Sequence, residues 1–181
     1  MSPIYVAMLR GINVGGQKIV KMEKLRISFE SLGFKRVRTY VQSGNVIFDA
    51  SKASSTKLSE RIKGRISSDF GFQIPVVLRT SDEMKKIIHD NPFLKDTKTD
   101  RSKLHVTLLS QLPATANIAK LDALDSDSDQ FRVLGQEVYL YCPNGYGRSK
   151  LSNNAVEKLL AVEATTRNWK TVNTLAELST R

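Results

Sequence analysis

The sequence predicts an α+β fold built from two consecutive ferredoxin-like (β-α-β-β-α-β type) halves, each with a mostly antiparallel sheet and helices packed on one face. Hydrophobic periodicity gives strands and helices in that order in the first part of the chain, and nearly the same order resumes after a polar stretch at residues 95–103. We therefore expect a ferredoxin-like half at 1–80, a connecting helix and loop at 81–102, and a second α+β half with C-terminal helices at 103–181.

The first half begins with an almost continuously apolar run at residues 4–9, as expected of a central strand buried on both faces. Apolar residues at helical spacing then predict helices at 22–32 and 58–70, and Gly33 is placed to end the first of them. The remaining predicted elements are strands, and they lie at residues 36–42, 45–48 and 75–79.

The second half follows a capping box at residues 80–83, which predicts a helix that Asn91-Pro92 ends. Its pattern is β-α-β-β-α, and no segment stands out as a closing strand. Trp169 is interpreted as a packing anchor and Thr171 as the cap of a final helix. The predicted elements are a strand at 104–108, a helix at 114–124, a hairpin of 131–134 with 137–141, a helix after Ser152, and the final helix through Val172, Leu175 and Leu178.

Composition limits the function classes. The formal net charge of +10 and the pI near 9.8 favour anionic partners, and basic residues gather in the first quarter of the chain. The alternative is that these cations lie on ordinary solvated helix and strand faces. The lone cysteine, Cys142, excludes an internal disulfide framework. One cysteine and two histidines in the whole sequence do not predict a zinc cluster, so no metal or cofactor is expected.

The same composition bears on location. The first residues lack the basic n-region of a signal peptide, and no stretch reaches the roughly 20 apolar residues that a membrane helix needs. A cytoplasmic protein without a membrane partner is therefore expected. Its oligomeric state is left open.

A glycine-rich loop follows the first strand, and topology predicts a neighbour for it. The third strand of a ferredoxin-like unit lies beside the first, which places Asn45 near Arg10. Two segments distant in sequence then form one polar rim at the end of the sheet. Its candidate ligand-binding residues are Arg10, Asn13, Gly15, Gly16, Lys18, Gln42, Ser43 and Asn45.

The loop has the chemistry of an anion site. Glycines let backbone N–H groups approach a ligand, the N-terminus of a following helix favours anions, and Arg10 and Lys18 add charge-assisted contacts. Gln17 separates Gly16 from Lys18, so the loop is not a P-loop. The alternative is a tight connection that needs glycine for its backbone geometry alone.

A second loop, residues 144–150, has a related character between a strand and a helix. Arg148, Ser149 and Lys150 are candidates to bind a second anionic group, against the alternative of a solvated loop. Adjacent residues rarely point at one another, so Ser149 and Lys150 are not favoured as a nucleophile and its base. Arg167 and Asn168 are the last candidate ligand-binding residues, and no residue stands out as catalytic.

Four blocks of sequence occur in order: LRGINVGG at 9–16, YVQSGNV at 40–46, SKL at 149–151 and TRNWKTV at 166–172. Together they resemble the hallmarks of the bacterial family of unknown function numbered 1697. The resemblance implies a duplicated α+β architecture and a cytoplasmic bacterial protein, and it brings no established activity, substrate or cofactor. Many members have Leu-Gly where this chain has Leu160-Ala161, a difference expected to affect only a helix end.

Three functions are compatible with these patterns, and whether the protein is an enzyme is open. The first is binding of an anionic small molecule, a nucleotide or phosphorylated metabolite, at the sheet-end rim. The second is an RNA- or DNA-binding module using the basic N-terminal surface, with Tyr5 and Phe48 as stacking candidates. The third is a non-catalytic interaction scaffold, in which Asn13, Gln42 and Asn45 satisfy only local backbone groups.

Overall fold

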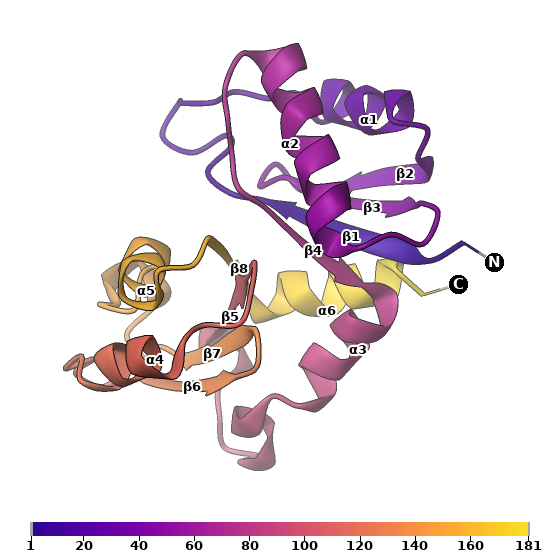
Figure 1. Ribbon diagram of the computed structural model, residues 1–181. Helices are drawn as coiled ribbons and strands as arrows, with labels where there is room; N and C mark the ends of the chain where they lie inside the picture. Colours follow the sequence, from indigo (N-terminus) through magenta and orange to yellow (C-terminus); the bar gives the residue numbers. More distant parts are fainter. Residues whose placement is uncertain (1, 181) are drawn as a thin grey trace. The chain divides into compact units, whose positions relative to one another are not determined.

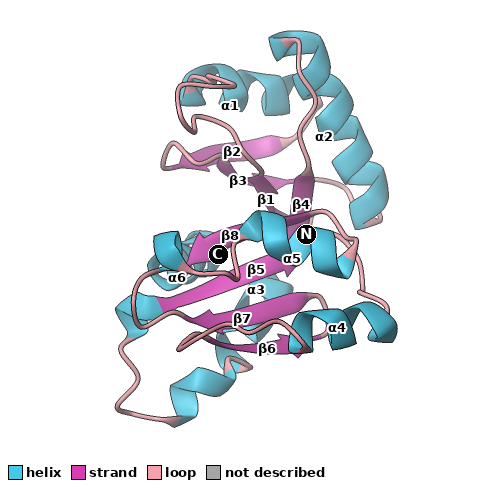
Figure 2. Ribbon diagram, turned by 90° about the vertical axis from the view of Figure 1, so that its left-hand side faces the viewer, coloured by secondary structure: helices cyan, strands magenta, loops and turns pink. Residues whose placement is uncertain are grey.

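The computed structural model describes residues 2–180 (Figure 1; Figure 2). The chain divides into two compact units: unit 1 comprises Met1–Lys85 with Leu175–Arg181, and unit 2 comprises Lys86–Thr174. Each unit carries a four-stranded antiparallel sheet with helices, which confirms the predicted α+β class with two similar halves. Within residues 2–180, no helix has the length and apolar character that crossing a membrane requires.

Unit 1 has the predicted element order, and its sheet has the strand order β2-β3-β1-β4. Its elements are β1 (Ile4–Leu9), α1 (Met22–Ser31), β2 (Lys35–Tyr40), β3 (Asn45–Asp49), α2 (Ser55–Phe70) and β4 (Val76–Thr80), followed by α3 (Ser81–His89). The third strand lies beside the first as predicted, with Met8 opposite Asn45. Gly33, just after α1, has a positive φ of 81°, which suits its predicted role in ending that helix.

Helices α1 and α2 cover one face of the unit 1 sheet, and an aromatic cluster fills the core beneath them (Figure 2). The ring of Phe48 lies 4.4 Å from Phe34, 5.3 Å from Phe29 and 5.7 Å from Tyr5, measured between centroids. Tyr5 and Phe48 are 3% and 0% exposed. The prediction that these two rings stack on nucleic-acid bases is therefore wrong, because the alternation of side chains along β1 and β3 turns both into the core.

Unit 2 repeats the arrangement, with the strand order β6-β7-β5-β8. Its elements are the short helices η1 (Pro92–Lys95), η2 (Arg101–Lys103) and η3 (Tyr146–Arg148), strands β5 (Leu104–Leu109), β6 (Gln130–Leu134), β7 (Glu137–Tyr141) and β8 (Ala164–Asn168), and helices α4 (Thr115–Asp122) and α5 (Asn153–Leu160). Helix α6 (Trp169–Leu178) follows β8, as α3 follows β4.

Strand β8 closes the second half, where the sequence pattern predicts no closing strand. Its sequence, ATTRN, is polar, so it lacks the apolar alternation that marks a strand, although Ala164 and Thr165 are buried. The predicted cap of the last helix also changes. The side-chain oxygen of Asn168 accepts a hydrogen bond from the backbone N–H of Thr171 at 2.8 Å, so Asn168 caps α6.

Equivalent main-chain hydrogen bonds occur within each of the two halves, as expected from their common topology. The backbone N–H of Leu9 donates to the carbonyl of Gly44 at 2.8 Å, and that of Leu109 donates to Gln136 at 2.9 Å. One residue further on, Arg10 donates to Pro75 at 3.0 Å, and Ser110 donates to Glu163 at 2.8 Å. In each half, the turn before the third strand therefore bonds to the end of the first strand at an equivalent position.

Helices α2 and α5 occupy equivalent positions in the two halves and end in the same left-handed conformation. Gly71 ends α2 with a φ of 77°, whereas Ala161 ends α5 with a φ of 54°. Ala161→Gly is expected to raise the free energy of unfolding by about 1 kcal/mol. A residue with a Cβ is destabilised by about 1–2 kcal/mol in the left-handed region, and the greater unfolded-state entropy of glycine offsets part of the gain from removing the Cβ.

The reciprocal change is the matched control for this helix-end effect. Gly71→Ala places a Cβ in open space, so only the backbone conformation opposes it, and stability should fall by about 1 kcal/mol. Urea denaturation of both variants checks the pair. Changes of the same sign in the two variants would contradict the explanation.

Candidate functional site

Three loops meet at one end of the unit 1 sheet, and we call them together the sheet-end rim: residues 10–20, 41–44 and 71–75. Main-chain hydrogen bonds join them, since Leu9 N–H donates to Gly44 and Arg10 N–H donates to Pro75. The structure thus brings together the two segments that topology predicted to be neighbours.

The glycine-rich loop is a small hairpin. Gly15 and Gly16 both have positive φ, at 58° and 74°, and Gln17 N–H donates to the carbonyl of Val14 at 3.0 Å. These are the features of a two-residue turn that requires a positive φ at both central positions, a conformation that glycine adopts readily. Helix α1 begins at Met22, as predicted, so the two glycines lie in the hairpin before the helix and not in its first turn.

The side chain of Asn13 ties this hairpin to the second loop. Its Nδ2 donates to the carbonyl of Gln42 at 2.8 Å and to that of Val20 at 3.0 Å. Its Oδ1 accepts from the N–H of Val20 at 2.8 Å. Asn13 therefore joins the two loops through hydrogen bonds from its amide to backbone groups of both.

The other predicted rim residues divide into anchored and exposed groups. Asn45 is buried, and its Nδ2 donates to the carbonyl of Tyr40 and to Ser43 Oγ, each at 3.0 Å. Lys18 donates to the carbonyl of Gln73 at 3.2 Å and lies over the ring of Phe72. Arg10 is half-buried, whereas the remaining predicted residues are exposed: Gly15, Gly16, Gln42 and Ser43.

Three of the six non-glycine residues with positive φ in residues 2–180 lie at the rim. Asn13, Lys18 and Val41 have positive φ values of 54°, 47° and 50°, although none of them is glycine. A β-branched residue such as Val41 is an outlier in this region, and strain of this kind gathers at functional sites. Val14, Ile19 and Val41 are also 65%, 63% and 47% exposed, so the rim offers apolar as well as polar surface.

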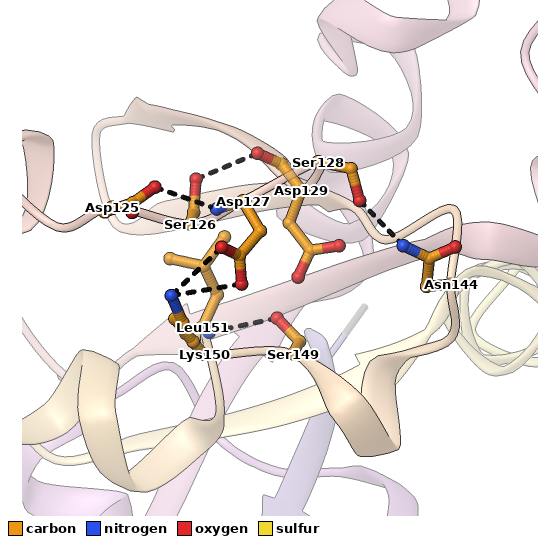
Figure 3. Close-up of polar contacts among 9 residues, drawn as sticks. All are labelled: Asp125, Ser126, Asp127, Ser128, Asp129, Asn144, Ser149, Lys150 and Leu151. Atoms are coloured by element: carbon orange, nitrogen blue, oxygen red, sulfur yellow. Dashed lines mark hydrogen bonds and ion pairs between the residues drawn. The ribbon is translucent and has the colours of Figure 1, made fainter.

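The second predicted loop lies against an acidic segment (Figure 3). Lys150 Nζ is 3.0 Å from Asp127 Oδ2, and this carboxylate raises the pKa of the lysine. Asn144 Nδ2 donates to Ser128 Oγ at 2.8 Å, which joins the two loops. Because aspartates at positions 125, 127 and 129 face this loop, the surroundings of Lys150 oppose the binding of a second anion.

The remaining candidates in unit 2 also serve local structure. Ser149 Oγ accepts from the N–H of Leu151 at 2.9 Å, so Ser149 and Lys150 have separate partners, and Arg148 is exposed. Arg167 is buried and donates to Thr165 Oγ1 at 2.6 Å, and burial lowers its pKa to about 10. Asn168 is the cap of α6 described above.

A packed polar network, which the sequence did not predict, lies under α5. Thr107 Oγ1 and Thr166 Oγ1 are 2.8 Å apart, and Thr166 donates to Asn153 Oδ1 at 3.0 Å. The ring of His105 stacks on Tyr146 at 4.7 Å, and burial lowers the pKa of His105 and raises that of Tyr146. The alternation of polar residues along β5 and β8 is the only sequence pattern that points to this network. That these residues face one another follows from the strand pairing.

Residues 2–180 contain no cluster of three His, Cys, Asp or Glu side chains arranged to hold a metal ion. Cys142 is buried, and that burial raises the pKa of its thiol. An activated thiol nucleophile needs a lowered pKa, whereas Cys142 packs in the hydrophobic core of unit 2.

Fold and site together define a duplicated ferredoxin-like α+β protein with one ordered loop platform at the end of its first sheet. The chain belongs to the family described as "Protein of unknown function (DUF1697)", which it matches over residues 3–139. Among solved structures it is similar to a conserved bacterial protein from Streptococcus pneumoniae, with a TM-score of 0.80 and 20% sequence identity over 99% of this chain and 100% of that one. At that identity the likeness shows the fold alone. Among curated protein sequences, none matches this chain with significance.

Proposed function

We propose that the sheet-end rim of unit 1 binds an anionic, phosphate-bearing small ligand, such as a nucleotide or a phosphorylated metabolite. The observation that carries the proposal is the tie from Asn13 to Gln42, which holds two exposed loops in a fixed relation. The N–H groups of Gly15 and Gly16 have no hydrogen-bond partner within residues 2–180, so they remain available as donors. Preorganised backbone donors are well suited to phosphate oxygens.

The charge of the chain supports the same site. Residues 1–85 contain 15 Lys and Arg against 7 Asp and Glu, so most of the net charge of +10 belongs to unit 1. Lys21 follows the hairpin directly and is exposed, and Lys18 reaches Gln73 across the rim. A phosphate group at the hairpin tip would compete for Lys18 with a neutral carbonyl, and a charge-assisted bond is the stronger of the two.

Calorimetric titration with pyrophosphate and with ATP tests the proposal. Lys18→Gln combined with Lys21→Gln is expected to weaken binding about tenfold or more, since two charge-assisted contacts are removed. The matched control is Lys52→Gln with Lys57→Gln, which makes the same change of net charge beyond the opposite end of β3. Absence of binding, or equal loss in the two double variants, would refute the rim as the site.

A nucleic acid is the second candidate, favoured by the exposed side chains of Lys21, Lys24 and Lys35, which have no acidic partner within residues 2–180. Such a complex gains most of its affinity from phosphate contacts and weakens steeply with salt. Fluorescence anisotropy with a single-stranded RNA at increasing salt separates the two candidates. A steep decline in affinity, together with no response to ATP, would favour the polymer.

A further inference from the structure

A groove of about 580 Å³ lies in unit 2 between helix α4 and strand β6, well separated in sequence from the rim. Ile118 contributes to it from the helix, and Phe131 and Val133 contribute from the strand. These three side chains are half-buried and pack on the core of the unit. The groove therefore has an apolar floor that is only partly covered.

Strand β6 is an edge of its sheet, next to β7 alone. In an antiparallel pair, residues alternate between bonded and non-bonded positions, and the pair that flanks a two-residue turn, here Leu134 with Glu137, is a bonded one. Phe131 and Val133 then turn their backbone N–H and C=O groups outward. A side-chain hydrogen bond supports this orientation, because Arg132 Nη1 donates to the outward carbonyl of Phe131 at 2.7 Å.

The charged side chains that line the groove are Asp122, Asp129 and Arg132. Neither carboxylate has a cationic partner within residues 2–180. Their neighbour Asp127 is already paired with Lys150 (Figure 3). The groove thus combines outward backbone groups, an apolar floor and two available negative charges.

We propose that this groove binds an extended peptide segment, which adds a strand beside β6 and bears an apolar side chain flanked by lysine or arginine. Main-chain bonds to Phe131 and Val133 supply affinity, as in other strand-addition complexes. The Phe131 carbonyl has two lone pairs, so it accepts from the peptide beside its bond from Arg132 Nη1. Side chains at alternate peptide positions point the same way, so an apolar residue lies on the groove floor while basic residues two positions away reach Asp122 and Asp129. The site is independent of the phosphate ligand proposed for unit 1.

The probe is a labelled peptide, Thr-Lys-Thr-Val-Thr-Lys-Thr, whose pattern reads the same in either strand direction. In the chain of residues 1–181 we expect saturable binding by fluorescence anisotropy, with amide chemical-shift changes centred on Phe131 and Val133. The counterpart in which glutamate replaces both lysines is expected to bind at least about tenfold more weakly, as is the lysine peptide to the Asp122→Asn, Asp129→Asn double variant.

A pair of substitutions at Val133 isolates the main-chain contact. Val133→Pro removes the outward N–H, a change that an edge strand tolerates, and is expected to weaken binding about tenfold or more relative to Val133→Ala, which keeps the donor. Thermal melts verify that both variants are folded. Equal affinity of the two variants, equal binding of the glutamate peptide, or shift changes located elsewhere would overturn the proposal. So would a concentration-dependent dimer with shift changes at the same residues, because a second copy of the chain would then be the occupant.

Discussion

Gly44→Ala is expected to lower the free energy of unfolding by about 3–5 kcal/mol, enough to unfold a marginally stable domain. A Cβ at this position would lie 2.6 Å from Ile12 Cδ1 and 2.9 Å from Leu9 Cβ, and Gly44 also has a φ of 78°. Ile12 and Leu9 are 1% and 0% exposed, so neither side chain can move aside into solvent. Overpacking and left-handed strain therefore add together.

Gly15→Ala is the control that separates the two causes. Its φ is 58°, but a Cβ there meets no atom within 4 Å, so only the backbone cost of about 1–2 kcal/mol applies. Thermal and urea denaturation give both values. If the two variants lost the same stability, the close approach of Gly44 to Ile12 would not be the cause. Adding Ile12→Val, which removes Cδ1, should recover part of the loss in Gly44→Ala and none in Gly15→Ala.

The contrast between these glycines shows what the sequence could and could not predict. The apolar run of β1 and the helical stripe of α1 predicted their elements, because burial of one face dictates the spacing of apolar residues. Topology then placed Asn45 beside the end of β1, and the pairing of Met8 with Asn45 confirms it. The sequence does not show that Gly44 is needed because a Cβ would clash with neighbours, whereas Gly15 is needed only for its turn conformation. That distinction depends on atoms that only the folded chain brings together.

Strand β8 was missed for a related reason. Its hydrogen bonds to β5 pair Thr107 with Thr166, and these hydroxyls satisfy one another inside the fold. A strand whose polar side chains are satisfied by partners about 60 residues away gives no local hydrophobic signal, although threonine itself favours strands. The equivalent strand β4 carries Val76, Val77 and Leu78 and was therefore visible.

The electrostatic surroundings of the second predicted anion site, the loop at residues 144–150, oppose anion binding. The sequence neighbours of Arg148 and Lys150 include no acidic residue. In the fold, Lys150 meets Asp127, 23 residues earlier in the chain. Ion pairs between loops depend on which turns the sheet brings side by side, so the net charge of a segment does not predict the field around it.

Asn13→Ala is expected to lower the free energy of unfolding by about 2–4 kcal/mol. Three hydrogen bonds disappear, and backbone groups of Val20 and Gln42 lose their side-chain partner, at about 1 kcal/mol for each bond. Alanine must also adopt the positive φ of 54°, which asparagine tolerates better than most residues. Asn13→Gly removes the same hydrogen bonds without that strain, so the difference between the two variants measures the backbone cost.

The control for the Asn13 tie is Gln42→Ala. The bond from Asn13 ends on the main-chain carbonyl of Gln42, which alanine retains, and the side chain itself is exposed. Stability should therefore change by no more than about 0.5 kcal/mol. Heteronuclear NMR adds a local readout: in Asn13→Ala the amides of the hairpin should lose order relative to β1, whereas in Gln42→Ala they should not. An equal loss of stability in both variants would mean that the two loops are joined by the Gln42 side chain, and that Asn13 does not hold the rim together.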